Sequence, residues 1–349
     1  MEMSAKARSG PLLKLVRACS FLAFTYTATS FATGATNTEA PQIPPRRWAD
    51  EERPFAASAR ERGEAFLGRE EEKLLKSIVR AGRRRDWSKA SAIIWDYRGT
   101  QTPIYSAALF AAIRCKQFDE GASIYEEMCQ RSVWRDLPSF SMALKIFSKS
   151  DPSRVGEIWE EAVAEHPLDA ALCAARLDAA AEVGDIQAAQ TLLDQMGRLE
   201  PPMEPNLLHF TSAIRACKNA DSEKSHETAK SFFELALGQG IEPDIVVFRE
   251  LMGACRRAPL HEVQTVYKFL KEMGLQADRI FSDVYLRAVL QLPRSRRFQS
   301  IAEAAEELRA MQDKGRLAEA RAVLAEFTSK DVQLTALGHL LNGALLQLQ

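Results

Sequence analysis

The chain repeats itself, and an internal repeat restricts the possible folds more strongly than any other feature of this sequence. The segment 210–217 (FTSAIRAC) aligns with 248–255 (FRELMGAC) at an offset of 38 residues. The tripeptides 204–206 (EPN) and 242–244 (EPD) lie the same 38 residues apart. A unit of about 35 residues with loops of variable length predicts a stacked array of repeats instead of independent globular domains.

The periodicity within each unit is helical. From Glu70 onward, apolar residues recur at spacings of three and four, and short polar breaks separate the segments. No alternating segment bounded by hairpin turns appears, which argues against strands. One helical hairpin is too small to bury its own apolar face, so neighbouring hairpins must stack, with their first helices on the concave side. The sequence predicts an all-α fold of helix-turn-helix repeats.

The end of one unit, Gly240-Ile241-Glu242-Pro243-Asp244, carries a resemblance to a known family. Together with the apolar-aromatic start of each first helix, it resembles the pentatricopeptide repeat family, whose unit ends near Gly-Ile-x-Pro-Asp. The resemblance covers residues 70–314 and implies a right-handed superhelical α-solenoid. The expected units are 71–101, 102–136, 137–169, 170–206, 207–244 and 245–278, with a degenerate seventh at 279–314 and capping helices at 315–349.

The resemblance also implies which residues would contact RNA. In that family, one base is recognised per repeat by the fifth residue of the first helix together with the last residue of the unit. The implied base-reading pairs are Ser106 with Asp136, Ser141 with Asp169, Ala174 with Asn206, Thr211 with Asp244, and Arg249 with Asp278. Ser or Thr with Asp implies guanine and Ala with Asn implies adenine, whereas Arg249 departs from the pattern. The alternative is that each Asp or Asn caps the next helix.

A second column of residues favours a phosphate-binding stripe. The thirteenth position of the six units is basic in four cases, and Lys218 precedes the one Asn in the column. Cations repeated at a constant rise suit the backbone of a single strand, although cations at helix C-termini also offset the helix dipole. The expected phosphate-contacting residues are Arg83, Arg114, Lys149, Lys218 and Arg257. Apolar Leu208, Val246 and Ile280 at the second position would sandwich the bases, or would pack in the core.

The N-terminal residues have the composition of a targeting segment. Residues 1–38 carry four basic residues against one acidic residue and are rich in Ser and Thr after Cys19. This composition is typical of an organellar transit peptide, while the apolar stretch 18–32 resembles the core of a signal peptide. We expect residues 1–45 to be a presequence for import into a chloroplast or mitochondrion, and 46–69 to be a Pro/Arg/Glu-rich linker. The apolar stretch is too short for a membrane span, which needs about 20 residues.

The sequence argues against several kinds of site. The five histidines are scattered, and no Cys-x-x-Cys pair occurs, so we expect no metal. Neither a Walker-type loop nor a strand-linked Gly-x-Gly-x-x-Gly is present, so we expect no nucleotide cofactor. The motifs of a zinc deaminase are also absent. The net charge of −1 argues against a protein that holds nucleic acid mainly through excess positive charge, so an RNA site must be local.

These observations favour one function and leave one rival. The favoured function is sequence-selective binding of single-stranded RNA in an organelle, acting in RNA processing, stability, editing or translation by occupancy without catalysis. We expect RNA as the partner, with protein partners in an organellar RNA-processing complex and without cofactors. The rival is a tetratricopeptide-like scaffold that holds a protein. A basic groove with polar fifth positions favours RNA, whereas an exposed apolar groove favours protein.

Overall fold

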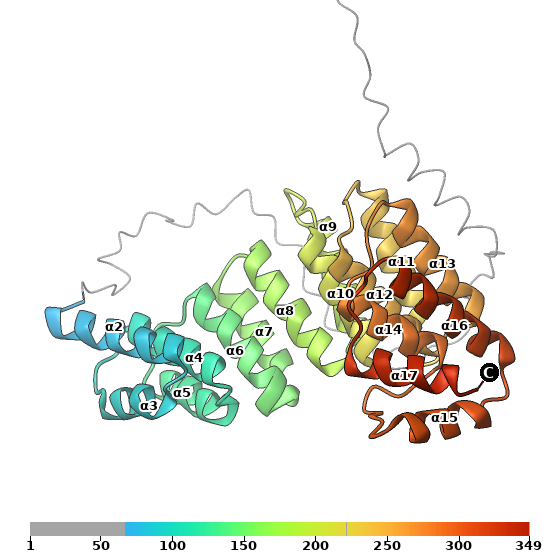
Figure 1. The fold of residues 1–349 in the computed structure, drawn as a ribbon. Helices are drawn as coiled ribbons and strands as arrows, with labels where there is room; N and C mark the ends of the chain where they lie inside the picture. The colour runs from blue at the N-terminus through green and yellow to red at the C-terminus, as the bar shows by residue number, and fades with distance from the viewer. Residues whose placement is uncertain (1–66, 221, 349) are drawn as a thin grey trace, which may run out of the picture.

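The computed structural model describes residues 67–220 and 222–348 as an elongated row of helices (Figure 1). The expected presequence and most of the linker lie outside the described residues. The described part contains α-helices and two short 3-10 helices and no strand, so the predicted all-α solenoid of helix-turn-helix repeats is confirmed. No helix in this part is both long enough and apolar enough to cross a membrane.

The first six units each contain two consecutive helices. The first helices are α2 (Arg69–Arg84), α4 (Thr102–Cys115), α6 (Leu137–Ser150), α8 (Ala170–Val183), α10 (Leu207–Ala220) and α12 (Ile245–Ala254). The second helices are α3 (Trp87–Asp96), α5 (Phe118–Gln130), α7 (Val155–Glu165), α9 (Ile186–Arg198), α11 (Ser225–Gly238) and α13 (Leu260–Glu272). The 3-10 turns η2 (Pro152–Arg154) and η3 (Cys255–Arg257) lie between the helices of the third and sixth units.

First and second helices occupy different sides of the stack. Each first helix packs directly on the next, from α2 to α14 (Arg279–Val289). The second helices α3, α5, α9, α11 and α13 pack between their own first helix and the following one, whereas α7 packs closely on α6 and not on α8. Consecutive second helices of these six units do not pack closely on one another. Because the more closely spaced row lies on the inside of a curved stack, the first helices line the inner side.

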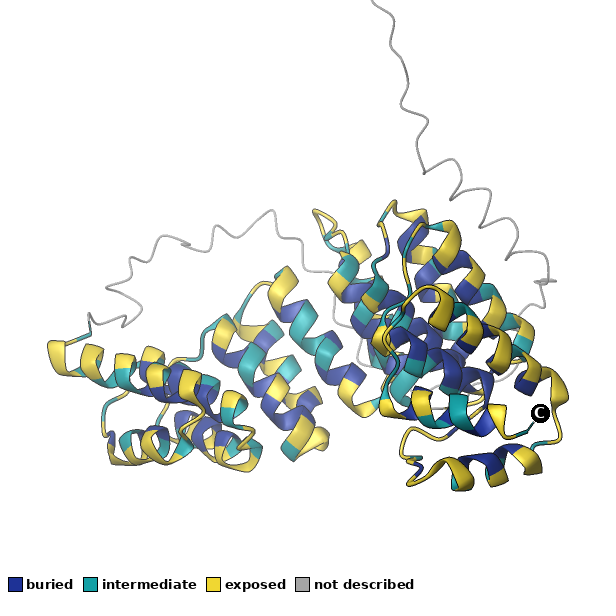
Figure 2. Ribbon diagram, in the orientation of Figure 1, coloured by how far each residue is buried: buried dark blue, intermediate teal, exposed yellow. Residues whose placement is uncertain are grey.

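Buried aromatic residues at the fourth position of the first helices hold the stack together. Tyr105, Phe140, Phe210 and Phe248 are fully buried, and the buried residues follow the interior of the helix row (Figure 2). Burying one such side chain stabilises the fold by about 1.5–3 kcal/mol. Stability is therefore distributed over the interfaces between neighbouring units, as expected for a solenoid.

The helices begin and end at recognisable capping residues. Asp136, Asp169, Asp244 and Asp278 each precede a first helix, and each accepts a hydrogen bond from a backbone N–H in its first turn. At the other end of α8, Gly184 has a φ of 75°. A Cβ at this glycine would lie 2.6 Å from the backbone nitrogen of Ala220, so the close approach of α8 and α10 requires glycine here.

The seventh unit differs from the arrangement expected for 279–314. Its first helix, α14, packs on α16 (Lys314–Ser329), while α15 (Ile301–Ala310) packs on α17 (Ala336–Leu346). The Tyr285 hydroxyl of α14 donates to Glu319 of α16 at 2.7 Å, and buried Arg316 of α16 donates to the carbonyl oxygen of Ala288 of α14 at 3.1 Å. Helix α16 thus occupies the second-helix position, because it supplies the apolar and polar partners of α14, and residues 290–313 form an insertion.

Candidate nucleic-acid interface

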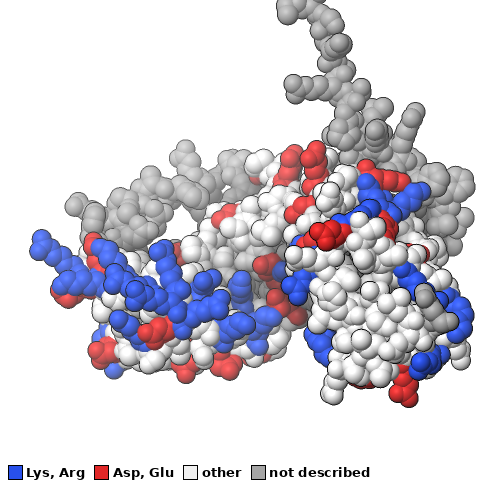
Figure 3. All heavy atoms as spheres, viewed as in Figure 1, with Lys and Arg blue, Asp and Glu red and all other residues white. Residues whose placement is uncertain are grey.

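Charge is divided between the two rows of helices. Within their bounds, the first helices α2 to α14 carry 15 Lys or Arg against 7 Asp or Glu. The second helices α3 to α13 carry 5 Lys or Arg against 14 Asp or Glu. The near-zero net charge of the chain therefore conceals a net +8 on the inner row and −9 on the outer row. Figure 3 shows Lys and Arg gathered in a band over the N-terminal arm, the part of the molecule formed by α2 to α7.

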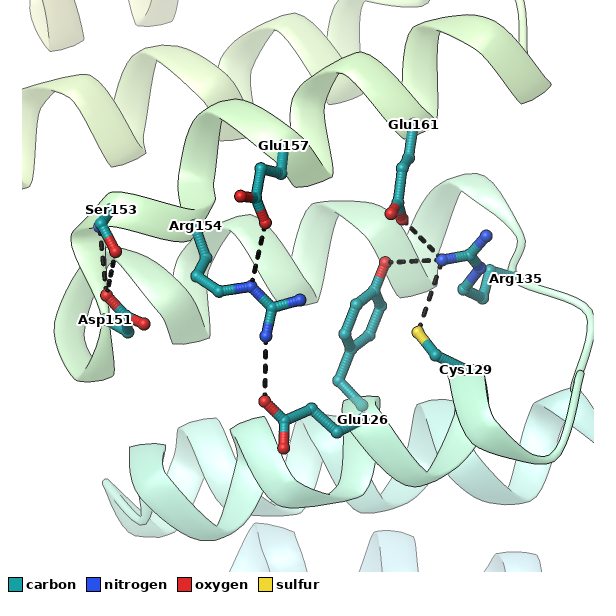
Figure 4. A network of polar contacts seen from close by, with 9 residues as sticks. Glu126, Cys129, Arg135, Asp151, Ser153, Arg154, Glu157 and Glu161 are labelled. Carbon is teal, nitrogen blue, oxygen red and sulfur yellow. Dashed lines mark hydrogen bonds and ion pairs between the residues drawn. The ribbon is translucent and has the colours of Figure 1, made fainter.

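Arginines beside the acidic helices α5 and α7 are paired with carboxylates. Arg135 contacts Glu161 at 2.6 Å and also the hydroxyl of Tyr125 at 3.4 Å. Arg154 bridges Glu126 at 2.9 Å and Glu157 at 3.2 Å (Figure 4). These pairs fasten the second unit to the third and leave no surplus of positive charge on the outer row.

The thirteenth-position residues differ in how far they are available. Arg83 and Arg114 are exposed and have no ion-pair partner among the described residues. Lys149 forms an ion pair with Glu182, the thirteenth residue of the next unit. Arg257 is exposed at the end of η3.

The loop of the inserted segment reaches the thirteenth position of the fifth unit. Arg294 donates to Oδ1 of Asn219 at 2.8 Å and to the carbonyl oxygen of Lys218, and the Lys218 ammonium pairs with Glu250. The loop thus covers the C-terminal end of α10. The predicted phosphate contact at Lys218 lies in a network of intramolecular contacts.

Sequence analysis missed several cations beside the predicted column. Five further exposed cations lie near the C-terminal ends of α2, α4 and α6 and have no ion-pair partner among the described residues: Arg80, Arg84, Arg85, Lys116 and Lys145. A search of one repeat position could not find them, because they occupy different positions in their units. The signal that could have revealed them is the excess of Lys and Arg over acids in consecutive first helices.

The last residues of the units do cap the next helix, but capping does not use their whole side chain. Asp136, Asp169 and Asp244 accept the capping hydrogen bond through Oδ1, at 2.9, 2.6 and 2.9 Å. Their second carboxylate oxygen has no hydrogen-bond partner among the described residues. Asn206 caps through its Oδ1 as well, at 3.0 Å from the Leu208 nitrogen, which leaves its NH₂ group as a donor. Capping and base recognition are therefore compatible at these four positions.

The fifth-position residues of the second to fifth units are partly exposed. The Ser106 hydroxyl lies 3.0 Å from the Ser139 hydroxyl. The Ser139 hydroxyl in turn donates to Asp136, so Ser139 links the two expected base-reading residues of the second unit. The Thr211 hydroxyl donates to the Leu207 carbonyl oxygen at 2.6 Å, and its lone pairs stay available. Among the described residues, the Ser141 hydroxyl makes no hydrogen bond to Asp169, and Ala174 has no polar group to offer Asn206.

In the sixth unit, the two expected base-reading residues form an ion pair with each other. Arg249 binds both carboxylate oxygens of Asp278, with Nε 3.2 Å from Oδ1 and Nη2 on Oδ2. Asp283, the fifth residue of the seventh unit, is also engaged internally, because it accepts a hydrogen bond at 2.7 Å from the hydroxyl of Thr335, the residue that caps α17. A bidentate guanidinium–carboxylate pair uses the acceptors that a base edge would need. The geometry thus separates the second to fifth units, with open acceptors, from the last two.

The three apolar second-position residues are on the surface. Leu208, Val246 and Ile280 are 55%, 39% and 52% exposed, so the alternative that they are core residues is wrong. They begin three consecutive first helices that pack side by side. Exposed apolar side chains at this spacing provide flat surfaces for stacking of bases or for contact with a protein.

The described residues contain no group of three or more side chains that could hold a metal ion. Burial raises the pKa of Cys173 to about 11 and the pKa values of Cys217 and Cys255 to about 12, so these thiols stay protonated at neutral pH. The hydrogen-bond donors, acceptors and cations described above lie together at this surface. Such an arrangement can bind a polyanion.

Comparison with known proteins gives structural likeness only. No family model and no curated protein matches the chain. A crystal structure of the pentatricopeptide repeat protein PPR10 from maize is 12% identical with a TM-score of 0.43, over 77% of this chain and 48% of that one. PPR10 in complex with an 18-nt psaJ RNA element is 14% identical with a TM-score of 0.45, over 79% of this chain and 46% of that one. The chain spans about half the length of these structures, and they are of the family that its repeats resemble.

Proposed function

We propose that this protein binds single-stranded RNA along the inner row of first helices. The observation that carries the proposal is the division of charge, +8 on the first helices against −9 on the second helices. A positive inner surface attracts a phosphate backbone, and an acidic outer surface repels it, so binding is directed to one side. The exposed second positions and the open acceptors of the second to fifth units support contact with bases on that same side.

The second to fifth units give this binding its sequence preference. Four units with one base each specify a short motif, with guanine expected opposite Ser106, Ser141 and Thr211 and adenine opposite Ala174. The protein then acts by occupancy, protecting, exposing or positioning the bound RNA without catalysis. We further propose that it works in an organelle, a chloroplast or mitochondrion, in RNA processing, stability, editing or translation, together with protein partners. The composition of residues 1–45 supports import.

A protein-binding role is the second candidate, and one observation favours it. In the sixth and seventh units, exposed Val246 and Ile280 coincide with internally paired polar residues, and exposed Leu208 of the fifth unit lies next to them in the first-helix row. An apolar strip without free polar groups suits a protein helix better than a base edge. The two roles can coexist, with RNA on the N-terminal units and a protein on the C-terminal units.

Selection of RNA from a random single-stranded pool tests the proposal. The full chain should enrich a short motif of about four specified positions, three of them guanine. The double substitution Thr211→Ala with Asp244→Asn should change the preference at one position only, from guanine toward adenine. Asn is chosen because Asn206 shows that it can cap a first helix as Asp does. Failure to enrich any RNA at low salt would refute RNA binding and favour the protein partner.

A further inference from the structure

The N-terminal arm carries more positive charge than base recognition needs. Seven exposed cations without an ion-pair partner among the described residues lie near the C-terminal ends of α2, α4 and α6: Arg80, Arg83, Arg84, Arg85, Arg114, Lys116 and Lys145. We call this set the N-terminal basic patch. The first unit supplies four of its members, yet its fifth and last residues are Leu75 and Gln101, which offer no carboxylate for a base. The densest part of the patch therefore lies beside the proposed base-reading units.

Helix capping does not account for a patch of this size. A cation in the last turn offsets the partial negative charge of a helix C-terminus, and the effect is confined to that turn. One cation for each of the three helices would serve this purpose. The surplus cations repel one another in the free protein, because like charges held close together destabilise a folded state. The surplus points to an external polyanion that neutralises it.

The position of the patch identifies RNA as that polyanion. The patch includes Arg83 and Arg114 of the thirteenth-position column, and α2, α4 and α6 are neighbours in the first-helix row. Figure 3 shows the cations of this arm as a band with few acidic side chains between them. A strand that leaves the base-reading units along this row would pass directly over the patch.

We propose that the N-terminal basic patch extends the RNA site beyond the segment recognised by the second to fifth units, with its cations of the second and third units at the edge of that segment and its four first-unit arginines on the phosphates of the flanking RNA. This inference rests on the proposed function. The patch supplies affinity without sequence preference, whereas the following units supply sequence preference. Because binding of single strands weakens with salt by about 0.7 in log–log slope for each neutralised phosphate, the patch should dominate the salt dependence.

The test compares a short RNA containing only the selected motif with RNAs that carry eight extra uridines on one end or the other. The full wild-type chain should bind one of the extended RNAs more tightly, and the gain should shrink as salt rises. The patch variant combines Arg80→Gln, Arg84→Gln and Lys116→Gln, which leaves the thirteenth-position residues intact. A matched control combines Lys89→Gln, Lys268→Gln and Arg309→Gln, three exposed cations of the second helices and the insertion.

Removal of three phosphate contacts should lower the salt slope by about 2. Between 50 and 200 mM salt, affinity for the extended RNA should then fall about 20-fold less for the patch variant than for wild type. The control should keep the wild-type slope, and both variants should keep the base preference. If wild type bound short and extended RNAs with equal affinity, or if the patch variant and the control had equal salt slopes, this inference would be overturned while the proposed function would stand. Absence of binding to every RNA would instead refute the proposed function.

Discussion

The ion pair between Arg249 and Asp278 gives a direct test of how the repeats select bases. Asp278 caps α14 through Oδ1, as the last residues of the other units do, but Arg249 occupies both of its carboxylate oxygens. The substitution Arg249→Thr gives the sixth unit the same residue pair as Thr211 with Asp244. We expect the sixth unit to gain a preference for guanine, because the substitution frees Oδ2 and adds a hydroxyl at the fifth position.

The magnitude follows from the contacts that change. Side-chain hydrogen bonds to a base edge discriminate against wrong bases by about 1–3 kcal/mol, or about 5-fold to 150-fold in affinity. The lost ion pair is partly exposed, at 22% for Arg249 and 36% for Asp278, so its contribution to stability is less than about 1 kcal/mol. The cap of α14, which contributes about 1 kcal/mol, is retained. The variant should therefore stay folded and bind a motif that is longer by one guanine.

The base preference of the Arg249→Thr variant is measured by RNA selection, followed by binding measurements with each of the four bases at the added position. Arg249→Lys serves as the control, because a lysine can keep the ion pair and should add no base. The reasoning is refuted if Arg249→Thr, with an unchanged melting temperature, selects the same motif as wild type. It is also refuted if Arg249→Lys and Arg249→Thr behave alike.

Three further predictions concern the scaffold. Arg294→Ala removes the contact between the inserted loop and α10, so trypsin should cleave after Arg296 and Arg297 faster than in wild type; an unchanged rate at these two sites would contradict a role for this contact. Gly184→Ala should lower the free energy of unfolding in urea by more than about 1 kcal/mol, because of its positive φ and the close Ala220 backbone. Gly197→Ala, where a Cβ meets nothing within 4 Å, should not destabilise, and equal effects would contradict the packing argument. A thiol reagent followed by peptide mass mapping should modify exposed Cys129 before it modifies Cys173, Cys217 and Cys255.

Much of the fold could be predicted from the sequence because its determinants are local. The spacing of apolar residues defined the helices, and Asp136, Asp169, Asp244 and Asp278 marked the starts of first helices through contacts three residues away. The seventh unit could not be predicted in this way. Its second helix follows an insertion of residues 290–313, and repeat spacing cannot show which of two later helices will pack on α14.

The candidate site was predicted in part. The thirteenth-position column indicated a positive edge, and the exposed Arg83 and Arg114 are consistent with it, although their contact with phosphate stays a prediction. The remaining members of the N-terminal basic patch were missed, because they share an edge of the stack and no single position in the repeat. The base-reading pairs also stay predictions. Of these pairs, Arg249 and Asp278 form an ion pair with each other in the structure.

The sequence by itself determined the repeating hairpin, its caps and its buried aromatic residues, since these depend on contacts within a few residues and on a period of about 35. Only the tertiary structure decided which charges remain available. Lys149 meets Glu182 across a unit boundary, Arg249 meets Asp278 from the other end of the sixth unit, and Arg294 reaches Asn219 from a distant loop. The physical reason is that the strength of an ion pair depends on distance and exposure in space, which are set only when the units stack. The same stacking places the cations of the first helices on one surface and the acids of the second helices on the other.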